Sequence, residues 1–205
     1  MKSLLIATTN PAKFAEYRLL LREFDLEVVS LREVGIDAEA PEDGASFAEN
    51  ARLKARFYFE RAEIATLADD GGLEVDALGG APGVRSHRWL GEDADDRMLA
   101  EEIVRRMSGI ESALRTARLR AAAALVLVEG GVRREHLVEA AFEGTIATRC
   151  YPRVQAGFPY RAVMIVPQRG CHLAELGEEE AARLSQRRIM VEALADDLKK
   201  LAAGG

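Results

Sequence analysis

Cysteine and histidine are scarce in this chain, which has two cysteines and three histidines among its 205 residues. Cys150 and Cys171 have neither the spacing of metal ligands nor the density of a disulfide framework. The histidines, His87, His136 and His172, are likewise scattered, which argues against a zinc site. We therefore expect two reduced thiols in an intracellular protein.

Long apolar runs and an excess of basic residues are also missing from the sequence. No stretch approaches the roughly 18 uninterrupted apolar residues of a membrane span. The opening MKSLLIATTN has one basic residue and too short an apolar run for a signal peptide. The net charge of −6 argues against a nucleic-acid-binding face. We expect a cytoplasmic protein with neither membrane nor nucleic-acid partners, whose charge suits a small anion that carries its own divalent cation.

Apolar residues make up 48% of the chain, enough to bury a sizeable core, and we expect a single domain over residues 1–205. Hydrophobic periodicity predicts alternating strands and helices. The predicted strands cover residues 2–8, 64–68, 116–128, 136–142 and 162–166, and the predicted helices begin at Pro11 or cover residues 46–61, 93–107 and 178–201. Asn10 before Pro11 is a typical N-cap, and Ser46 with Glu49 forms a capping box. The consecutive strands within residues 116–142 predict an α/β domain with a mixed sheet.

Two adjacent carboxylates, Asp69 and Asp70, come directly after an apolar run, and two glycines follow them at once. A buried carboxylate is costly unless it has a partner or a metal ion. Glycine lets the backbone turn sharply and lets an anionic ligand come close. The segment therefore indicates a cation-assisted site, although Asp-Asp-Gly-Gly taken alone is equally typical of a turn.

Further candidates for a phosphate site lie on either side of a predicted helix start. Thr8, Asn10 and Lys13 fall at a strand-to-helix turn, where free N–H groups and the helix dipole attract phosphate, although the glycines of a Walker A loop are missing. Glu42 lies in a loop two residues before Gly44, and Lys54 lies on the helix that follows. Each of them, taken alone, is more typical of a solvated surface residue. Together these residues would supply phosphate ligands and the hard oxygen ligands of Mg²⁺. The joint hypothesis is phosphoanhydride hydrolysis.

Four motifs together resemble the inosine triphosphate pyrophosphatase family, in its order and at its spacing. They are ATTNPAK at 7–13 with Glu16, EDGASFAENARLKA at 42–55, LADDGGLEVDALGGAPGV at 67–84 and SHRWLGEDA at 86–94, with a weaker match in AELGEEE at 174–180. The resemblance implies a two-lobed α/β fold around a mixed twisted sheet, with a central active-site cleft. It also implies a homodimer that uses Mg²⁺ to split ITP, dITP or XTP into the monophosphate and pyrophosphate.

The same resemblance implies roles for particular residues. The triphosphate would be held by Thr8, Asn10, Lys13 and Lys54, and the metal by Glu42 and Asp70. Asp70 would also orient or deprotonate the attacking water, with Asp69 supporting the site. The remaining substrate-binding positions are Gly71, Phe158, Tyr160 and Arg187.

Departures from the family pattern cluster where the family recognises the base. Its Gly-Phe-Gly-Tyr-Asp-Pro segment is GFPYRA at 157–162, so Pro159 and Arg161 are changed. Further changes are Ala181 for a lysine, Gln186 for a histidine and Gly71 for a serine. A site that loses hydrogen-bond donors loses discrimination, so we expect relaxed or altered base specificity.

The altered positions leave several alternatives open. One alternative is that Arg161, Arg183 or Arg188 supplies the hydrogen-bond donors to the base that the changed positions have lost. The other is that all three are ordinary solvated surface arginines. A non-catalytic nucleotide-binding protein of the same fold, or a pyrophosphatase specialised for a modified or pyrimidine nucleotide, would also fit the sequence.

Overall fold

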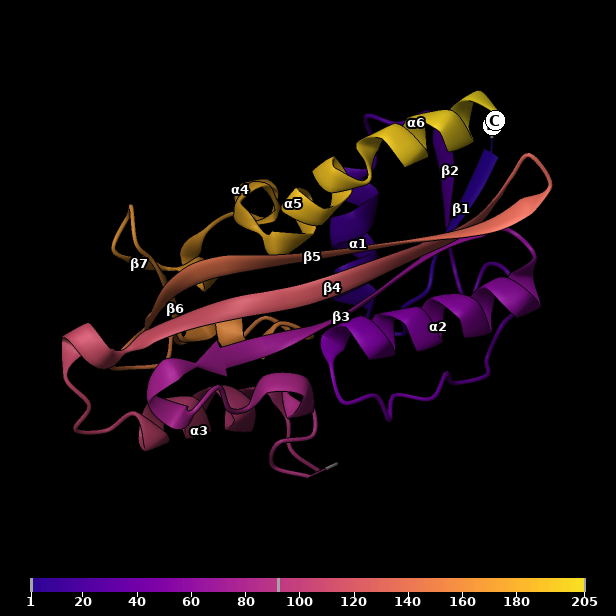
Figure 1. Cartoon of the computed structure of the whole chain (residues 1–205). Coiled ribbons are helices and arrows are strands. Elements are labelled where there is room, and N and C mark those ends of the chain that lie inside the picture. The colour runs from indigo at the N-terminus through magenta and orange to yellow at the C-terminus, as the bar shows by residue number, and fades with distance from the viewer. Residues whose placement is uncertain (1, 92, 205) are drawn as a thin grey trace. The chain divides into compact units, whose positions relative to one another are not determined.

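The computed structural model describes residues 2–91 and 93–204, so position 92 of the motif at 86–94 lies outside the described residues. Figure 1 shows the order of the elements. The strands are β1 (Lys2–Ile6), β2 (Leu26–Ser30), β3 (Ala65–Val75), β4 (Thr116–Glu129), β5 (Val132–Ile146), β6 (Met164–Val166) and β7 (Cys171–His172). The helices are α1 (Pro11–Leu20), α2 (Phe47–Ala62), α3 (Asp96–Arg106), α4 (Glu178–Leu184), α5 (Gln186–Ala193) and α6 (Ala195–Ala203).

The strands pair in the order β2-β1-β3-β4-β5-β6-β7. β1 runs parallel to β2 and to β3, whereas β6 runs antiparallel to β5 and to β7. A link of two glycines, Gly130 and Gly131, joins β4 to β5, and their φ values of 57° and 79° are those that a tight hairpin turn requires. The predicted mixed α/β sheet is confirmed.

Two compact units divide the chain, and β3, β4 and β5 each contribute residues to both. The first unit contains the chain up to Asp70, Ala121–Ala140 and the chain from Gln186 onward; the second contains Gly71–Arg120 and Ala141–Ser185. Each unit has its own fully buried apolar side chains, such as Leu5 and Leu125 in the first and Ile103 and Met164 in the second. None of the helices within residues 2–91 and 93–204 is long and apolar enough to cross a membrane.

Strand β3 continues through the Asp-Asp-Gly-Gly segment to Val75, so both the predicted strand end at residue 68 and the turn hypothesis are wrong. The reason is a close approach within the second unit. A Cβ on Gly72 would lie 2.0 Å from Ser86 Oγ and 2.7 Å from Gly83 O. Ser86 Oγ accepts a hydrogen bond from the Leu73 N–H (2.9 Å) and donates one to Gly83 O (2.7 Å). Gly72 is therefore needed for packing against the strand rather than for a turn.

The predicted long helix over residues 178–201 is wrong, because the segment forms α4, α5 and α6. Ser185 between α4 and α5 has extended backbone angles, φ −71° and ψ 153°. Its N–H (3.2 Å) and its hydroxyl (2.9 Å) both donate to Ala182 O, which closes α4. Leu194, at φ −94° and ψ 3°, separates α5 from α6. The break at Ser185 makes Arg187 the second residue of a new helix.

The two helix starts argued from capping residues are confirmed. Asn10 Oδ1 accepts from the N–H groups of Ala12 and Lys13, and Ser46 accepts from the Glu49 N–H. The Glu49 carboxylate accepts from the Ala45 N–H (2.7 Å), one residue before the N-cap. Other boundaries differ: β5 is longer than predicted, residues 159–162 form a short 3₁₀ helix ahead of β6, and β2 and β7 were not predicted.

Candidate active site

The site residues of the first unit gather near β1, on whose two sides the chain places β2 and β3. The chain leaves β1 through α1 to β2 on one side and returns through α2 to β3 on the other, so right-handed crossovers place α1 and α2 on opposite faces (Figure 1). Such a switch point at the carboxyl ends of parallel strands is where open α/β sheets bind ligands. β3 pairs with β1 only as far as Leu67, and Asp69 and Asp70 follow after one further residue, Ala68.

Asp69 and Asp70 are both buried, with 2% and 7% of their surface exposed. Successive side chains of a strand point to opposite faces of the sheet. Asp69 meets residues of α1 and α5, whereas Asp70 meets residues of α2. The two neighbouring carboxylates therefore belong to two different groups of side chains.

The first group is a buried ionic network around Asp69. Asp69 Oδ1 lies 3.2 Å from Lys13 Nζ, and Asp69 Oδ2 lies 2.8 Å from Arg187 Nη2. Arg187 Nη1 also lies 3.4 Å from Glu16 Oε2, and all four residues are at most 6% exposed. Burial alone would raise the pKa of Asp69, but Arg187 and Lys13 outweigh burial and hold that pKa well below its usual range. Burial lowers the pKa of the Lys13 ammonium, against the attraction of Asp69.

The second group surrounds Lys54. Its Nζ lies 2.9 Å from Glu42 Oε1 and 3.7 Å from Asp70 Oδ1. Burial alone would lower the pKa of Lys54, but Asp70 and Glu42 outweigh burial and raise it. Asp70 Oδ2 accepts a hydrogen bond from Asn50 Nδ2 (2.9 Å). One charged lysine thus holds two carboxylates that come from different elements.

This donor set suits a magnesium ion that arrives with a phosphate. Across the part of the chain that the structure describes, no three His, Cys, Asp or Glu residues gather closely enough to hold a metal ion by themselves. Mg²⁺, however, is usually held by one or two carboxylates together with substrate phosphates and water. Glu42 and Asp70 fit that requirement, because both already meet a single positive charge, that of Lys54.

At the start of α1, Thr8 and Asn10 hold the turn together. Asn10 Oδ1 accepts from the N–H groups of Ala12 (2.9 Å) and Lys13 (3.2 Å), and Thr8 Oγ1 accepts from the Asn10 N–H (3.2 Å). Two of the helix-terminal N–H groups that a phosphate would use are therefore bonded to Asn10. The Lys13 side chain adds the full charge, which Asp69 faces in this structure.

The predicted site residues Gly71, Phe158 and Tyr160 belong to the second unit. Tyr160 is 5% exposed, and its hydroxyl donates to Ser86 O (2.6 Å). Burial raises the pKa of that hydroxyl. The guanidinium carbon of Arg161 lies 3.8 Å from the centre of the Phe158 ring. One face of the predicted stacking ring is therefore covered by a cation, an arrangement that is itself attractive.

The three arginines considered as replacement donors differ in their surroundings. Arg161 is 6% exposed, so the hypothesis of a surface arginine is wrong for this residue. Arg183 is exposed and lies 3.6 Å from Glu179. Arg188 lies 2.7 Å from Glu192 and 2.9 Å from Glu23. The changed positions Ala181 and Gln186 are both buried.

One functional candidate was missed from the sequence, namely Asn50. Its side chain is 1% exposed and bonds Asp70 directly. A usable signal was present, because Asn50 and Lys54 are four residues apart and so share one face of α2. That signal is weak, because a single asparagine on a helix indicates no chemistry by itself.

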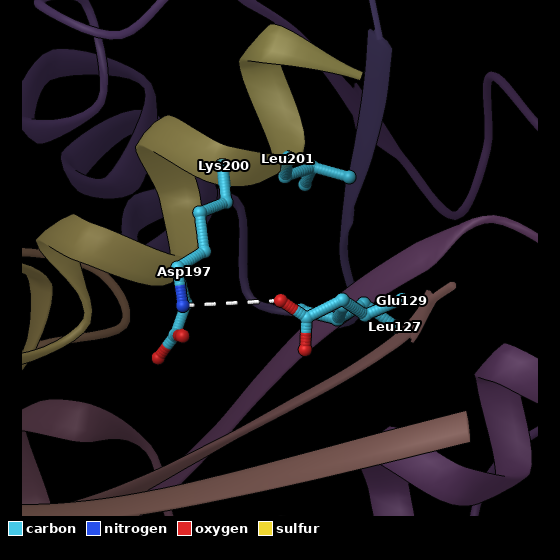
Figure 2. Close-up of a pocket in the computed structure, with 5 residues that line it drawn as sticks. All are labelled: Leu127, Glu129, Asp197, Lys200 and Leu201. Carbon is cyan, nitrogen blue, oxygen red and sulfur yellow. Dashed lines mark ion pairs between the residues drawn. The ribbon is translucent and has the colours of Figure 1, made fainter. Parts of the chain in front are cut away.

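A small pocket elsewhere in the first unit contains none of the predicted site residues. It is lined by Leu127, Glu129, Asp197, Lys200 and Leu201. Figure 2 shows Lys200 of α6 turned toward Glu129 of β4, with 3.8 Å between Nζ and Oε1. Its volume of about 10 Å³ suits a single water molecule. The pocket is therefore too small for a nucleotide.

The chain is an α/β protein with a mixed sheet, and the buried charged residues of its candidate site lie at the point of the sheet where β1 and β3 meet. Residues 4–197 match the model of the Ham1 family, and the chain belongs to that family. The resemblance drawn from the sequence motifs is thereby confirmed.

Relatives of known name match over nearly their whole length. The chain is 40% identical to the dITP/XTP pyrophosphatase of Bacillus subtilis (98% of this chain, 96% of the relative). It is 39% identical to the dITP/XTP pyrophosphatase of Geobacillus kaustophilus (100% and 98%). The solved structure of a HAM1 protein from Coxiella burnetii matches with a TM-score of 0.82 at 30% identity, covering 98% of this chain and 100% of that one.

Proposed function

We propose that this protein hydrolyses nucleoside triphosphates to the monophosphate and pyrophosphate, acting on the non-canonical purine nucleotides dITP, ITP and XTP. The relatives at 39–40% identity are dITP/XTP pyrophosphatases, and they align over nearly the whole chain. The observation that carries the proposal is the pair of buried aspartates in β3, each of which faces a lysine. Such a site can bind a polyanion and also supply a base.

The proposed metal is Mg²⁺, held by Glu42 and Asp70 together with the phosphates. When bound, it would neutralise phosphate charge and lower the pKa of a water molecule. Lys54, which meets both carboxylates, would turn its charge toward the phosphates, and Lys13 would bind the triphosphate from the α1 side.

Asp70 is the proposed general base. Its Oδ2 is held by Asn50, which leaves Oδ1 to take a proton from the attacking water. The water oxygen forms a bond to the α-phosphorus, and the bond from that phosphorus to the bridging oxygen breaks and releases pyrophosphate. Asp69 has a supporting role, since it holds Lys13 in place. Positioning and electrostatic stabilisation supply most of the remaining rate enhancement.

We further propose that base selection is relaxed or altered, with Phe158, Arg161 and Arg187 as the residues to examine. The support is Arg161, whose guanidinium covers the Phe158 ring and which stands where the family has an acid. A purine that stacks on this ring would either use its other face or displace the arginine. The chain is proposed to act as one domain, in line with its length of 205 residues, and as a homodimer, on family resemblance alone. Light scattering coupled to gel filtration tests the dimer.

The experiment that tests the function measures pyrophosphate and orthophosphate separately. Purified protein with Mg²⁺ is given ITP, dITP, XTP, dUTP and the ordinary nucleoside triphosphates. We expect pyrophosphate release, fastest with the 6-keto purines dITP, ITP or XTP. Release confined to a pyrimidine or another modified base would indicate a specialised enzyme. Nucleotide binding without any release would favour the non-catalytic alternative and overturn the proposal.

A further inference from the structure

We propose that Asn50 is a positioning residue for the reaction, because it fixes the Asp70 carboxylate and ties it to the loop that carries Glu42. That loop, residues 37–46 between β2 and α2, is called the acidic loop below. The inference rests on the proposed function, since it assigns Asn50 a role in the same site. Asn50 would not touch the substrate and would act through Asp70.

The orientation of the Asn50 side chain is fixed by its two partners. Its Oδ1 accepts a hydrogen bond from the Gly44 N–H at 2.8 Å, and its Nδ2 donates to Asp70 Oδ2 at 2.9 Å. A backbone N–H can only donate, so the oxygen of the amide must face Gly44 and the nitrogen must face Asp70. With 1% of its surface exposed, the side chain has almost no access to water that could replace either bond.

The acidic loop approaches Asn50 so closely that only glycine fits at the point of contact. A Cβ on Gly44 would lie 2.7 Å from Asn50 Oδ1 and 2.8 Å from Glu49 Cβ. Glu42 stands two residues before this contact, and its carboxylate lies 2.9 Å from Lys54 Nζ. Lys54 is one helical turn beyond Asn50 on the same face of α2. Asn50 thus bonds directly to Asp70, one of the two carboxylates proposed to hold the metal, and through Gly44 to the loop that carries the other, Glu42.

This arrangement predicts an effect on the chemical step rather than on substrate affinity. Without the Nδ2 donor, the Asp70 carboxylate loses the hydrogen bond that orients it, and only the longer contact with Lys54 (3.7 Å) remains to aim its basic oxygen. Of the proposed phosphate-binding residues, Lys13, Thr8 and Asn10 lie on or before α1 and do not depend on Asn50. Lys54 lies on α2 but keeps its contact with Glu42 at 2.9 Å when Asn50 is replaced. An interaction that aligns a reacting group lowers the barrier to reaction, so its loss reduces kcat more than it raises KM.

The test compares Asn50→Ala and Asn50→Asp with the control Tyr58→Phe. Tyr58, which is 3% exposed, ties the same loop to the same helix, because its hydroxyl accepts from the Ala40 N–H (3.2 Å). Asn50→Asp keeps an acceptor for the Gly44 N–H but replaces the donor to Asp70 with a negative charge. We expect kcat for dITP to fall by about 10²-fold in both Asn50 variants, with KM within about threefold of wild type. Tyr58→Phe should retain kcat.

Hydrogen exchange provides a readout that does not depend on activity. The Gly44 amide should exchange faster in Asn50→Ala and remain protected in Asn50→Asp, so the second variant separates the loop bond from the bond to Asp70. An active wild type with unchanged kcat in both Asn50 variants would overturn the positioning role alone. An equal loss of kcat in Tyr58→Phe would also overturn it, because any loosening of the loop would then suffice. Wild-type protein that releases no pyrophosphate would overturn the proposed function and the positioning role with it.

Discussion

Replacing Arg187 by methionine should destabilise the protein strongly, whereas the same change at Arg188 should not. Both residues are in α5 and both lie beside carboxylates, but Arg187 is 4% exposed and Arg188 forms its ion pairs at the surface. Methionine is long, unbranched and adaptable, so it fills most of the space that the arginine leaves. The comparison therefore isolates the loss of a buried cation.

The expected size of the effect follows from the network around Arg187. Removing one partner of a buried ion pair costs about 3–5 kcal/mol, because a buried charge is left uncompensated. Here Asp69 keeps Lys13 at 3.2 Å, so the lower end, about 3 kcal/mol, is expected. Glu16 accounts for part of that cost, since Arg187 Nη1 lies 3.4 Å from its carboxylate. Arg188→Met removes surface pairs worth about 0–1 kcal/mol.

Urea unfolding of the wild type and the two variants measures this difference as a change in the free energy of unfolding. A loss of 3 kcal/mol should also lower Tm by roughly 6–12 °C in a chain of this size. Adding Glu16→Gln to Arg187→Met should restore part of the stability, because it removes a buried carboxylate that has lost its contact with Arg187 in that variant. If Arg187→Met were no less stable than Arg188→Met, the buried network would not stabilise the fold as argued.

Three further predictions concern the site and β3. Asp70→Asn should reduce turnover by about 10²- to 10⁴-fold while nucleotide still binds, and near-normal turnover would remove Asp70 as the base. Lys13→Ala should raise KM for the triphosphate, and unchanged kcat and KM would contradict a phosphate site at α1. Gly72→Ala should lower the free energy of unfolding by about 1–3 kcal/mol, because its Cβ would lie 2.0 Å from Ser86 Oγ; a chemical denaturation midpoint equal to that of wild type would contradict the close packing of β3.

The features that could be predicted from the sequence depend on residues close together in the chain. Asn10 caps α1 and Ser46 caps α2 through bonds that span three residues or fewer, so the local motif is sufficient. The alternation of strands and helices, and the mixed sheet that it implies, likewise follow from local periodicity.

The features that could not be predicted depend on contacts between distant residues. The glycines after Asp70 have the local chemistry of a turn, but packing against Ser86 keeps that segment in β3. Asp69 and Arg187 are 118 residues apart in sequence, so neither position by itself reveals the ion pair. The break at Ser185, which no proline or glycine marks, comes from its backbone angles and its two bonds to Ala182 O.

The different surroundings of Asp69 and Asp70 depend on the alternation of side chains along a β-strand. Side chains of neighbouring strand residues point to opposite faces of the sheet. Two consecutive residues therefore present one acid to α1 and α5 on one face and the other acid to α2 on the other face. One residue inserted between them would turn both acids toward the same layer, which would take Asp69 away from Lys13 or leave Lys54 with Glu42 alone. Loops elsewhere in the chain can lengthen at small cost, whereas this pair of residues admits neither insertion nor deletion.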